Sequence, residues 1–250
     1  MKKILFTLTS AAILTSSALA DFTRVEMGAG AWLQEPKGGA VYTDGGADGV
    51  YVSSEDKKVS PYVWMLIKHP VPVLPNIRLE YVSIEDKGRA SGEFKDFIIT
   101  SASTTLSYDM KQYDIIPYYN ILDNTSWITL DLGLDIKIVD ISYNAAPSAP
   151  FTGYRDSATI PLPLLYARGK VQIPSTGLGL EADIKYLTTG SSTVYDLRAK
   201  VDYTLKFIPL INPAVEVGYR VQKLDIDEDS IDAKLDIDFS GFYAGMMLRF

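Results

Sequence analysis

The stretch Trp127–Ile138 reads WITLDLGLDIKI and decides the fold class. Its even-numbered positions are all Ile or Leu, and its odd-numbered positions hold Trp, Thr, Asp, Gly, Asp and Lys. Because successive side chains of a strand point to opposite faces, this stretch predicts a strand with one apolar and one charged face. Residues 195–207 repeat the pattern, with apolar side chains at odd positions and polar or charged side chains at even ones.

Shorter copies of this alternation recur along the chain at 24–33, 77–81, 180–186 and 215–222. Helical periodicity is absent outside the first twenty residues, so we predict an all-β fold: a closed, antiparallel, up-and-down transmembrane β-barrel. Ten strands are expected, with eight as the alternative count. The predicted strands cover residues 22–34, 58–69, 76–84, 101–121, 126–142, 158–172, 178–189, 193–207, 214–224 and 233–250.

The N-terminal twenty residues have the composition of a secretory signal. Lys2-Lys3 supply the positive end, Ile4–Leu14 the apolar stretch, and Ala18–Ala20 the small-residue cleavage site. The apolar stretch is too short to cross a bilayer as a helix. The predicted organisation is a cleaved signal at 1–20 and one outer-membrane barrel domain at 21–250.

Composition excludes several classes of protein. The chain is 47% apolar and 22% charged, which is too hydrophobic for a disordered chain. It has no Cys, so it has no disulfides, Cys-ligated zinc, iron–sulfur cluster or thiol nucleophile. Its formal net charge of −7, which becomes −9 without Lys2 and Lys3, argues against a nucleic-acid partner. No later apolar run approaches the ~18 residues of a spanning helix, so a membrane location requires a closed barrel.

The predicted links between strands alternate in length. Short turns on one side and longer loops on the other are typical of outer-membrane barrels, and an even strand count places both termini on the periplasmic, short-turn side. The long links are 35–57, 85–100 and 143–157, whereas the short ones are 70–75, 122–125, 173–177 and 209–213.

Alternation alone does not say which face of the strands points outward. A soluble lipocalin-like barrel has the same period with its apolar face inward. Dense charge on the polar face and 16 Tyr, many near the ends of the apolar faces, favour the membrane alternative. In the last strand the apolar residues change from odd to even positions between Phe239 and Phe242, which predicts a β-bulge near Ser240-Gly241.

The C-terminal strand has an alternating apolar face that ends on Phe250. Such an ending resembles the signal by which the barrel-assembly machinery recognises its clients, so that machinery is an expected partner during biogenesis. The alternative is an ordinary last strand of a periplasmic sandwich. The residues predicted to form the assembly signal are Phe242, Met246, Leu248 and Phe250.

Several segments are similar to a family of small outer-membrane β-barrels of Gram-negative bacteria that is named for a Gly-Gly pair near its N-terminus. The resemblance implies the barrel fold and the outer-membrane location, and it implies no activity. The segments that carry it are Gly28–Trp32, Pro36–Gly39, Tyr118–Asn124, Leu130–Leu134, Pro161–Ala167 and the terminal strand to Phe250.

The polar face of the predicted strands is the main candidate site. If it lines the barrel interior, its nine acids and ten bases must pair, because unpaired charges are costly in a low dielectric. Near-equality of sign favours a paired network over a selective pore, and ten strands leave a filled or very narrow lumen. The predicted lumen network comprises Arg24, Glu26, Arg78, Glu80, Asp131, Asp135, Lys137, Arg168, Lys170, Glu181, Asp183, Lys185, Asp196, Arg198, Lys200, Asp202, Lys206, Glu216 and Arg220. Small lumen residues, among them Gly28, Gly30, Gly133 and Gly218, are expected to leave some room.

Other chemistry has weak candidates. His69 is the only histidine, and we expect it at the periplasmic rim rather than in a catalytic cleft. Asp225, Asp227 and Asp229 are spaced like the start of a calcium loop, but that loop's glycine and terminal bidentate glutamate are missing. No catalytic site, cofactor or metal site is therefore predicted.

The sequence thus predicts an exported, monomeric outer-membrane barrel with a structural or surface-interaction role. Its loops 35–57, 85–100 and 143–157 are expected to contact outer-membrane lipid, lipopolysaccharide or outside partners. A narrow channel for ions or small solutes is the alternative. An outer-membrane hydrolase or lipid-modifying enzyme is a third hypothesis.

Overall fold

The fold is seen in a computed structural model of the chain. It describes residues 23–42, 49–71, 73–94, 97–125, 127–145, 154–190, 192–205, 211–228 and 233–250. The predicted signal, Lys206 and Asp229 lie outside these residues.

Every regular element of the described residues is a β-strand. The strands are β1 (Arg24–Tyr42), β2 (Gly49–Ser53), β3 (Lys58–Lys68), β4 (Asn76–Phe94), β5 (Phe97–Thr125), β6 (Ile128–Ala145), β7 (Tyr154–Gln172), β8 (Leu178–Thr189), β9 (Ser192–Thr204), β10 (Asn212–Glu228) and β11 (Ala233–Arg249). No helix in this part of the chain is long and apolar enough to span a membrane.

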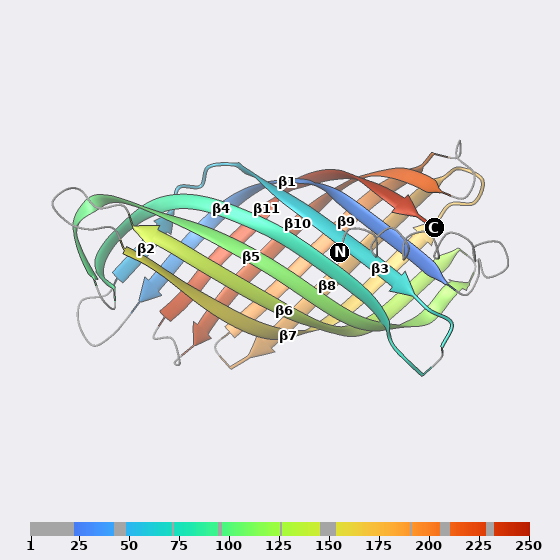
Figure 1. Cartoon of the computed structure of the whole chain (residues 1–250), viewed down its shortest axis with the longest axis horizontal. Helices are drawn as coiled ribbons and strands as arrows, with labels where there is room; N and C mark the ends of the chain where they lie inside the picture. Colours follow the sequence, from blue (N-terminus) through green and yellow to red (C-terminus); the bar gives the residue numbers. More distant parts are fainter. Residues whose placement is uncertain are drawn as a thin grey trace, which may run out of the picture.

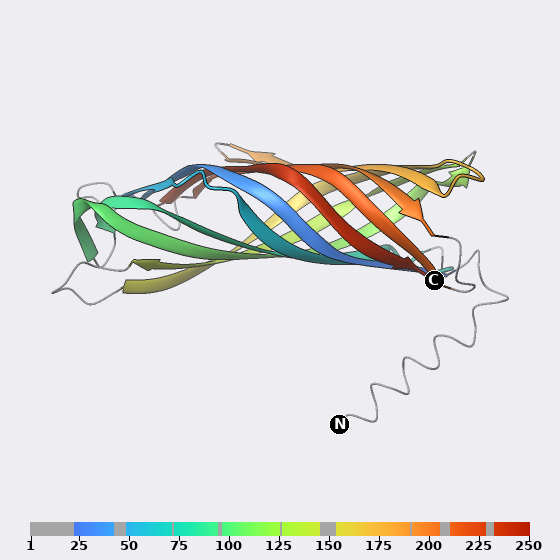
Figure 2. The ribbon, with the colours of Figure 1, turned by 90° about the horizontal axis from the view of Figure 1, so that it is seen from above.

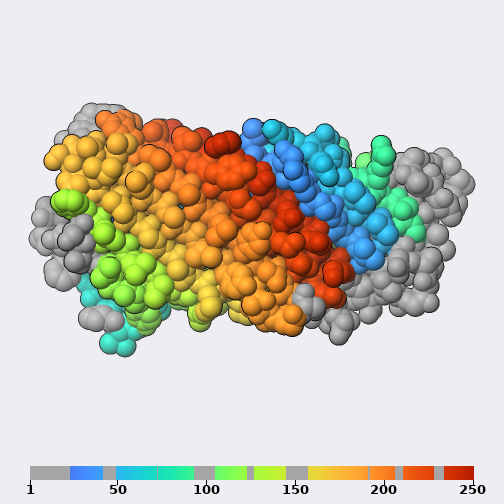
Figure 3. All heavy atoms as spheres, turned by 180° about the vertical axis from the view of Figure 1, so that it is seen from behind, coloured from blue at the N-terminus to red at the C-terminus, as the bar shows by residue number. Residues whose placement is uncertain are grey.

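The strands form one closed antiparallel barrel. Strands β4 to β11 pair in sequence order, and β11 returns to pair with β1 from Glu26↔Arg249 to Tyr42↔Ala233. Strands β2 and β3 both lie between β1 and β4, one above the other, so the barrel has ten strand positions and the predicted count is confirmed. Figures 1 and 2 show the tilted strands wrapping around a long cylinder. In Figure 3, β11 (red) lies beside β1 (blue) and closes the wall.

The strands are longer than predicted at one end of the barrel. Strand β1 continues to Tyr42, and β4 and β5 form a hairpin that reaches Phe94 and Phe97. The segments 35–57, 85–100 and 143–157 were predicted as loops, and most of their described residues are barrel wall. The prediction was wrong there because the phase of the alternation changes at these points.

The outer surface changes from apolar to polar at one level of the barrel. On β4 the outward side chains are Ile77, Leu79 and Tyr81, followed by Ser83 and Glu85. An apolar band therefore encircles the barrel, with aromatic side chains at both edges, as a membrane barrel requires. The aromatic residues of the upper edge are Tyr81, Tyr113, Tyr186, Tyr195, Tyr219 and Phe242, and those of the lower edge are Tyr119, Trp127, Tyr203 and Phe250.

The inner surface changes in the opposite sense at the same level. On β4 the inward side chains change from Arg78 and Glu80 to Val82 and Ile84, all four of them buried. The matching changes are from Lys137 to Val139 on β6, from Lys185 to Leu187 on β8, from Asp196 to Val194 on β9, and from Arg220 through Gln222 to Leu224 on β10. Below this polarity boundary the barrel is apolar outside and charged inside, and above it the barrel has the apolar interior of a protein in water.

The polarity boundary also explains the last strand. Phe239 is fully buried and Phe242 is 68% exposed, so they do point to opposite faces. The pairing of β11 with β1 and with β10 is nevertheless continuous through Ser240 and Gly241. The predicted bulge near Ser240-Gly241 is therefore wrong: the apolar face of β11 moves from inside to outside without any change in register.

Candidate functional site

The charged side chains of the lower barrel lie in its interior and are buried. Of the described ones on the barrel axis side, most are less than 10% exposed, although Arg24 is at the rim with a side chain 40% exposed. A channel wide enough for water would expose the side chains that line it. The buried members are Glu26, Arg78, Glu80, Asp114, Asp131, Asp135, Lys137, Arg168, Lys170, Glu181, Asp183, Lys185, Asp196, Lys200, Asp202, Glu216, Arg220 and Arg249.

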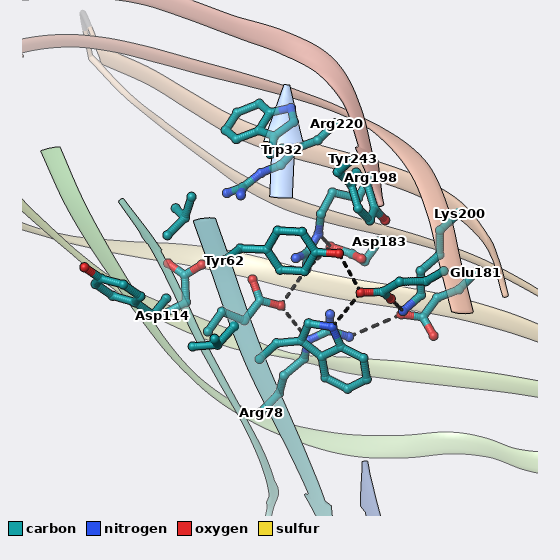
Figure 4. Close-up of a pocket in the computed structure, with 16 residues that line it drawn as sticks. Trp32, Tyr62, Arg78, Asp114, Glu181, Asp183, Arg198, Lys200, Arg220 and Tyr243 are labelled. Atoms are coloured by element: carbon teal, nitrogen blue, oxygen red, sulfur yellow. Dashed lines mark hydrogen bonds and ion pairs between the residues drawn. The ribbon is translucent and has the colours of Figure 1, made fainter. Parts of the chain in front are cut away.

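Ion pairs join these side chains across the lumen. Lys185 Nζ lies 2.6 Å from Glu80 and also contacts Asp114, while Arg198 bridges Glu80 (2.6 Å) and Asp183 (2.8 Å). Buried charges are tolerated when each is paired and hydrogen-bonded, and here each base faces acids from strands far apart in the sequence. Figure 4 shows the centre of this network, with Arg78, Glu181, Arg198 and Lys200 converging from different strands.

A second layer of the network lies nearer the short-turn end. Arg249 pairs with Asp202 at 2.6 Å and lies 3.7 Å from Glu26, which Lys170 also approaches at 3.6 Å. Arg249 is the penultimate residue, so the C-terminal strand contributes both to the outer band and to the interior.

Aromatic rings occupy the space beside the small lumen residues. A Cβ atom added at Gly28 would lie 2.5 Å from the Trp64 ring, and one at Gly218 would lie 2.6 Å from the Tyr243 ring. Trp64 also donates to Glu216 at 3.1 Å and stacks under Lys200 at 4.7 Å. The glycines were expected to leave room, and this expectation is wrong because the rings fill it. The cavity that remains at the centre is about 20 Å³, enough for roughly one water.

The charged zone ends in an amide pair and then an apolar core. Gln112 and Gln222 exchange two hydrogen bonds, of 3.2 and 2.7 Å, across the barrel between β5 and β10. A fully buried apolar layer lies above them. Its members include Ile84, Met110, Val139, Val194, Leu224 and Phe239.

One polar cluster lies in the upper barrel, beyond the apolar layer. The buried Asp86 carboxylate accepts hydrogen bonds from Tyr51 (3.0 Å) and Ser53 (2.7 Å). Burial raises the pKa of Tyr51, and nearby Tyr108 and Asp86 raise it further, so this hydroxyl stays protonated as a donor. The cluster holds β2 against β4.

The structure brings together all the described members of the predicted network. Asp135 is the least well served, because neither carboxylate oxygen has a hydrogen-bond partner among the described residues. Lys206 lies outside the described residues, so its placement stays a prediction.

Sequence reasoning missed several interior residues. Asp114 was not assigned to a face because Ile115-Ile116 follows it, which obscures the alternation. Arg249 could have been found, because it occupies the inward phase of a strand whose outward phase was recognised. Tyr62 and Trp64 made their strand look apolar on both faces, although their polar atoms both bind Glu216.

His69 lies in the short turn between β3 and β4. Its Nδ1 accepts a hydrogen bond from the Val71 amide (3.2 Å), and its Nε2 lies 3.0 Å from the Pro75 carbonyl. Both ring nitrogens thus serve the turn, at the periplasmic end where the sequence placed them.

The acidic residues of β10 lie on the outside of the upper barrel. Asp225 faces Asp236 across the strand pair, and Lys223 lies 2.9 Å from Asp236. No group of three or more acidic or histidine side chains that could hold a metal ion is found among the described residues. Asp227 is half exposed beside Lys234 (3.6 Å), and Asp229 lies outside the described residues.

The fold and interior together define a class: a closed antiparallel β-barrel with an apolar outer band and a filled, charged core. No family model and no curated protein matches the sequence, so the resemblance to the Gly-Gly family stays a prediction.

Three solved structures to which the chain is similar are barrels of low identity. They are the outer membrane protease OmpT from Escherichia coli (12% identity, 92% of this chain and 96% of that chain, TM-score 0.47), the translocator domain of autotransporter NalP from Neisseria meningitidis (14%, 100% and 96%, TM-score 0.44) and a Pseudomonas aeruginosa FadL homologue (8%, 92% and 90%, TM-score 0.30). At these scores the fold rests on the chain's own strand pairing.

Proposed function

We propose that this chain is an exported outer-membrane barrel whose interior is closed and whose role is structural or made through its outer surface. The observation that carries the proposal is the filled lumen. Paired charges block its lower part, and the apolar layer that includes Met110 and Leu224 blocks its upper part. A permeating ion would have to leave water at that apolar layer, which is very costly.

The partners follow from the same proposal. Lipid covers the apolar band, and lipopolysaccharide meets the polar wall above it. The C-terminal strand ending on Phe250 would be read by the barrel-assembly machinery, and closure of β11 on β1 leaves no free edge for pairing, which supports a monomer. The proposal gives the chain no catalytic role, since His69 serves a turn.

Single-channel recording tests the closed lumen. We expect mature protein, refolded in detergent and shown to be folded by heat-modifiable migration on a gel, to give no discrete current steps in planar bilayers. A general porin inserted in the same bilayers is the positive control. Reproducible steps from the folded band, changed in size by Lys200→Gln in the lumen, would contradict the proposal and favour a narrow channel.

A further inference from the structure

We propose that the outer face of β3, β4 and β5 holds one phosphorylated lipid of the outer leaflet, such as the lipid A part of lipopolysaccharide. This inference rests on the proposed membrane location and names a specific site on the outer surface. Two hollows on the same three strands carry it, one polar and one apolar.

The polar hollow lies just above the polarity boundary. It has a volume of about 880 Å³, and three ammonium groups line it, those of Lys58, Lys87 and Lys111. Lys111 is 3.6 Å from Asp109, whereas no ion pair to Lys58 or Lys87 is formed within the described residues. Two ammonium groups are thus available to an anionic ligand at the level where lipid phosphates lie.

The apolar hollow lies directly below, within the outer band. It has a volume of about 750 Å³ and is lined by outward side chains of β1, β3, β4, β5 and β11. Methionines Met27, Met65 and Met246 contribute to it, and their flexible side chains adapt readily to a ligand of irregular shape. A saturated acyl chain fits the chemistry of this surface.

The two hollows are joined by a pair of tyrosines. Tyr81 and Tyr113 are register partners whose ring centroids are 5.1 Å apart, and both line the apolar hollow. Lys111 is the next outward residue after Tyr113 on β5, about 7 Å along the strand. A single amphiphile can therefore place its phosphate on the lysines and its chain in the hollow below.

The opposite wall has a different charge pattern and offers a matched control. Above the boundary on β10 and β11, Lys223 and Lys234 are both paired, with Asp236 (2.9 Å) and Asp227 (3.6 Å). Neither lysine is therefore available to a phosphate, so charge complementarity places the lipid on the β3–β5 face.

Binding of bisphosphorylated lipid A to the folded, detergent-solubilised protein tests the site. We expect saturable binding of about one molecule per barrel, and a Lys58→Gln/Lys87→Gln variant that binds about tenfold more weakly. The Lys223→Gln/Lys234→Gln variant should bind as the parent does. Dephosphorylated lipid A should bind more weakly to the parent, and inorganic phosphate should not compete.

Each other outcome has a distinct meaning. Equal weakening by the two double variants, or equal binding of the dephosphorylated lipid, would overturn the site. Competition by inorganic phosphate would show an anion site without the acyl-chain contribution, and would also overturn it. Failure of the parent to reach a heat-modifiable, membrane-inserting form would instead contradict the proposed function, before any lipid is added.

Discussion

Replacing Lys185 with Met is expected to lower the free energy of unfolding by about 3–5 kcal/mol. The Lys185 side chain is fully buried and its ammonium group pairs with Glu80 and Asp114. Met keeps much of the volume but removes the positive charge, so two buried carboxylates lose their compensation. The measurement is urea-induced unfolding of the refolded barrel, followed by the fluorescence of its 3 Trp.

The matched control is Lys223→Met, the same substitution on the outside of the upper barrel. Lys223 pairs with Asp236 where water screens both groups, so its loss should cost about 1 kcal/mol or less. Adding Asp114→Asn to the Lys185→Met variant should recover part of the loss, because it removes one uncompensated charge. Similar losses for Lys185→Met and Lys223→Met would mean that the lumen is hydrated, against the closed interior.

Leu134→Arg is expected to destabilise the barrel in lipid vesicles by about 2–4 kcal/mol. Leu134 is 55% exposed on the outside of β6, between Leu132 and Ile136, in the middle of the apolar band. An Arg there must lie in hydrocarbon or distort the bilayer to reach water. Equilibrium unfolding from vesicles gives the difference from the parent protein.

Ser142→Arg is the control for depth. Ser142 points outward on the same strand but lies above the polarity boundary, so an Arg there should change stability by less than about 1 kcal/mol. If Leu134→Arg were as well tolerated as Ser142→Arg, the apolar band would not be in contact with lipid.

Most of the lower barrel could be predicted from the sequence. There the outward positions are apolar and the inward ones charged on nearly every strand, so a period of two fixes the strands and the lumen face together. Residues such as Asp131, Arg168 and Glu181 were assigned to the interior on that basis, and the structure joins them through Arg168.

The upper barrel could not be predicted in the same way. The rule that apolar side chains point outward holds only in lipid, and above the boundary the solvent is water. Val82 and Ile84 keep the alternation but point inward, so a search for one constant apolar face ends the strand at that level. The same reversal between Phe239 and Phe242 looked like a bulge. Pairings across the lumen, such as Gln112 with Gln222, depend on the curvature of the closed wall and leave no local signal.

Single-cysteine labelling along β6 tests the polarity boundary most directly. The chain has no native Cys, so each substitution introduces the only thiol. With the barrel folded into preformed vesicles, a membrane-impermeant maleimide should label Ser142→Cys. It should spare Leu134→Cys, covered by lipid, and Val139→Cys, buried in the apolar core, while all three should react after unfolding. Labelling of Leu134→Cys in the folded, vesicle-bound protein would contradict the account, because it would put the apolar band in water.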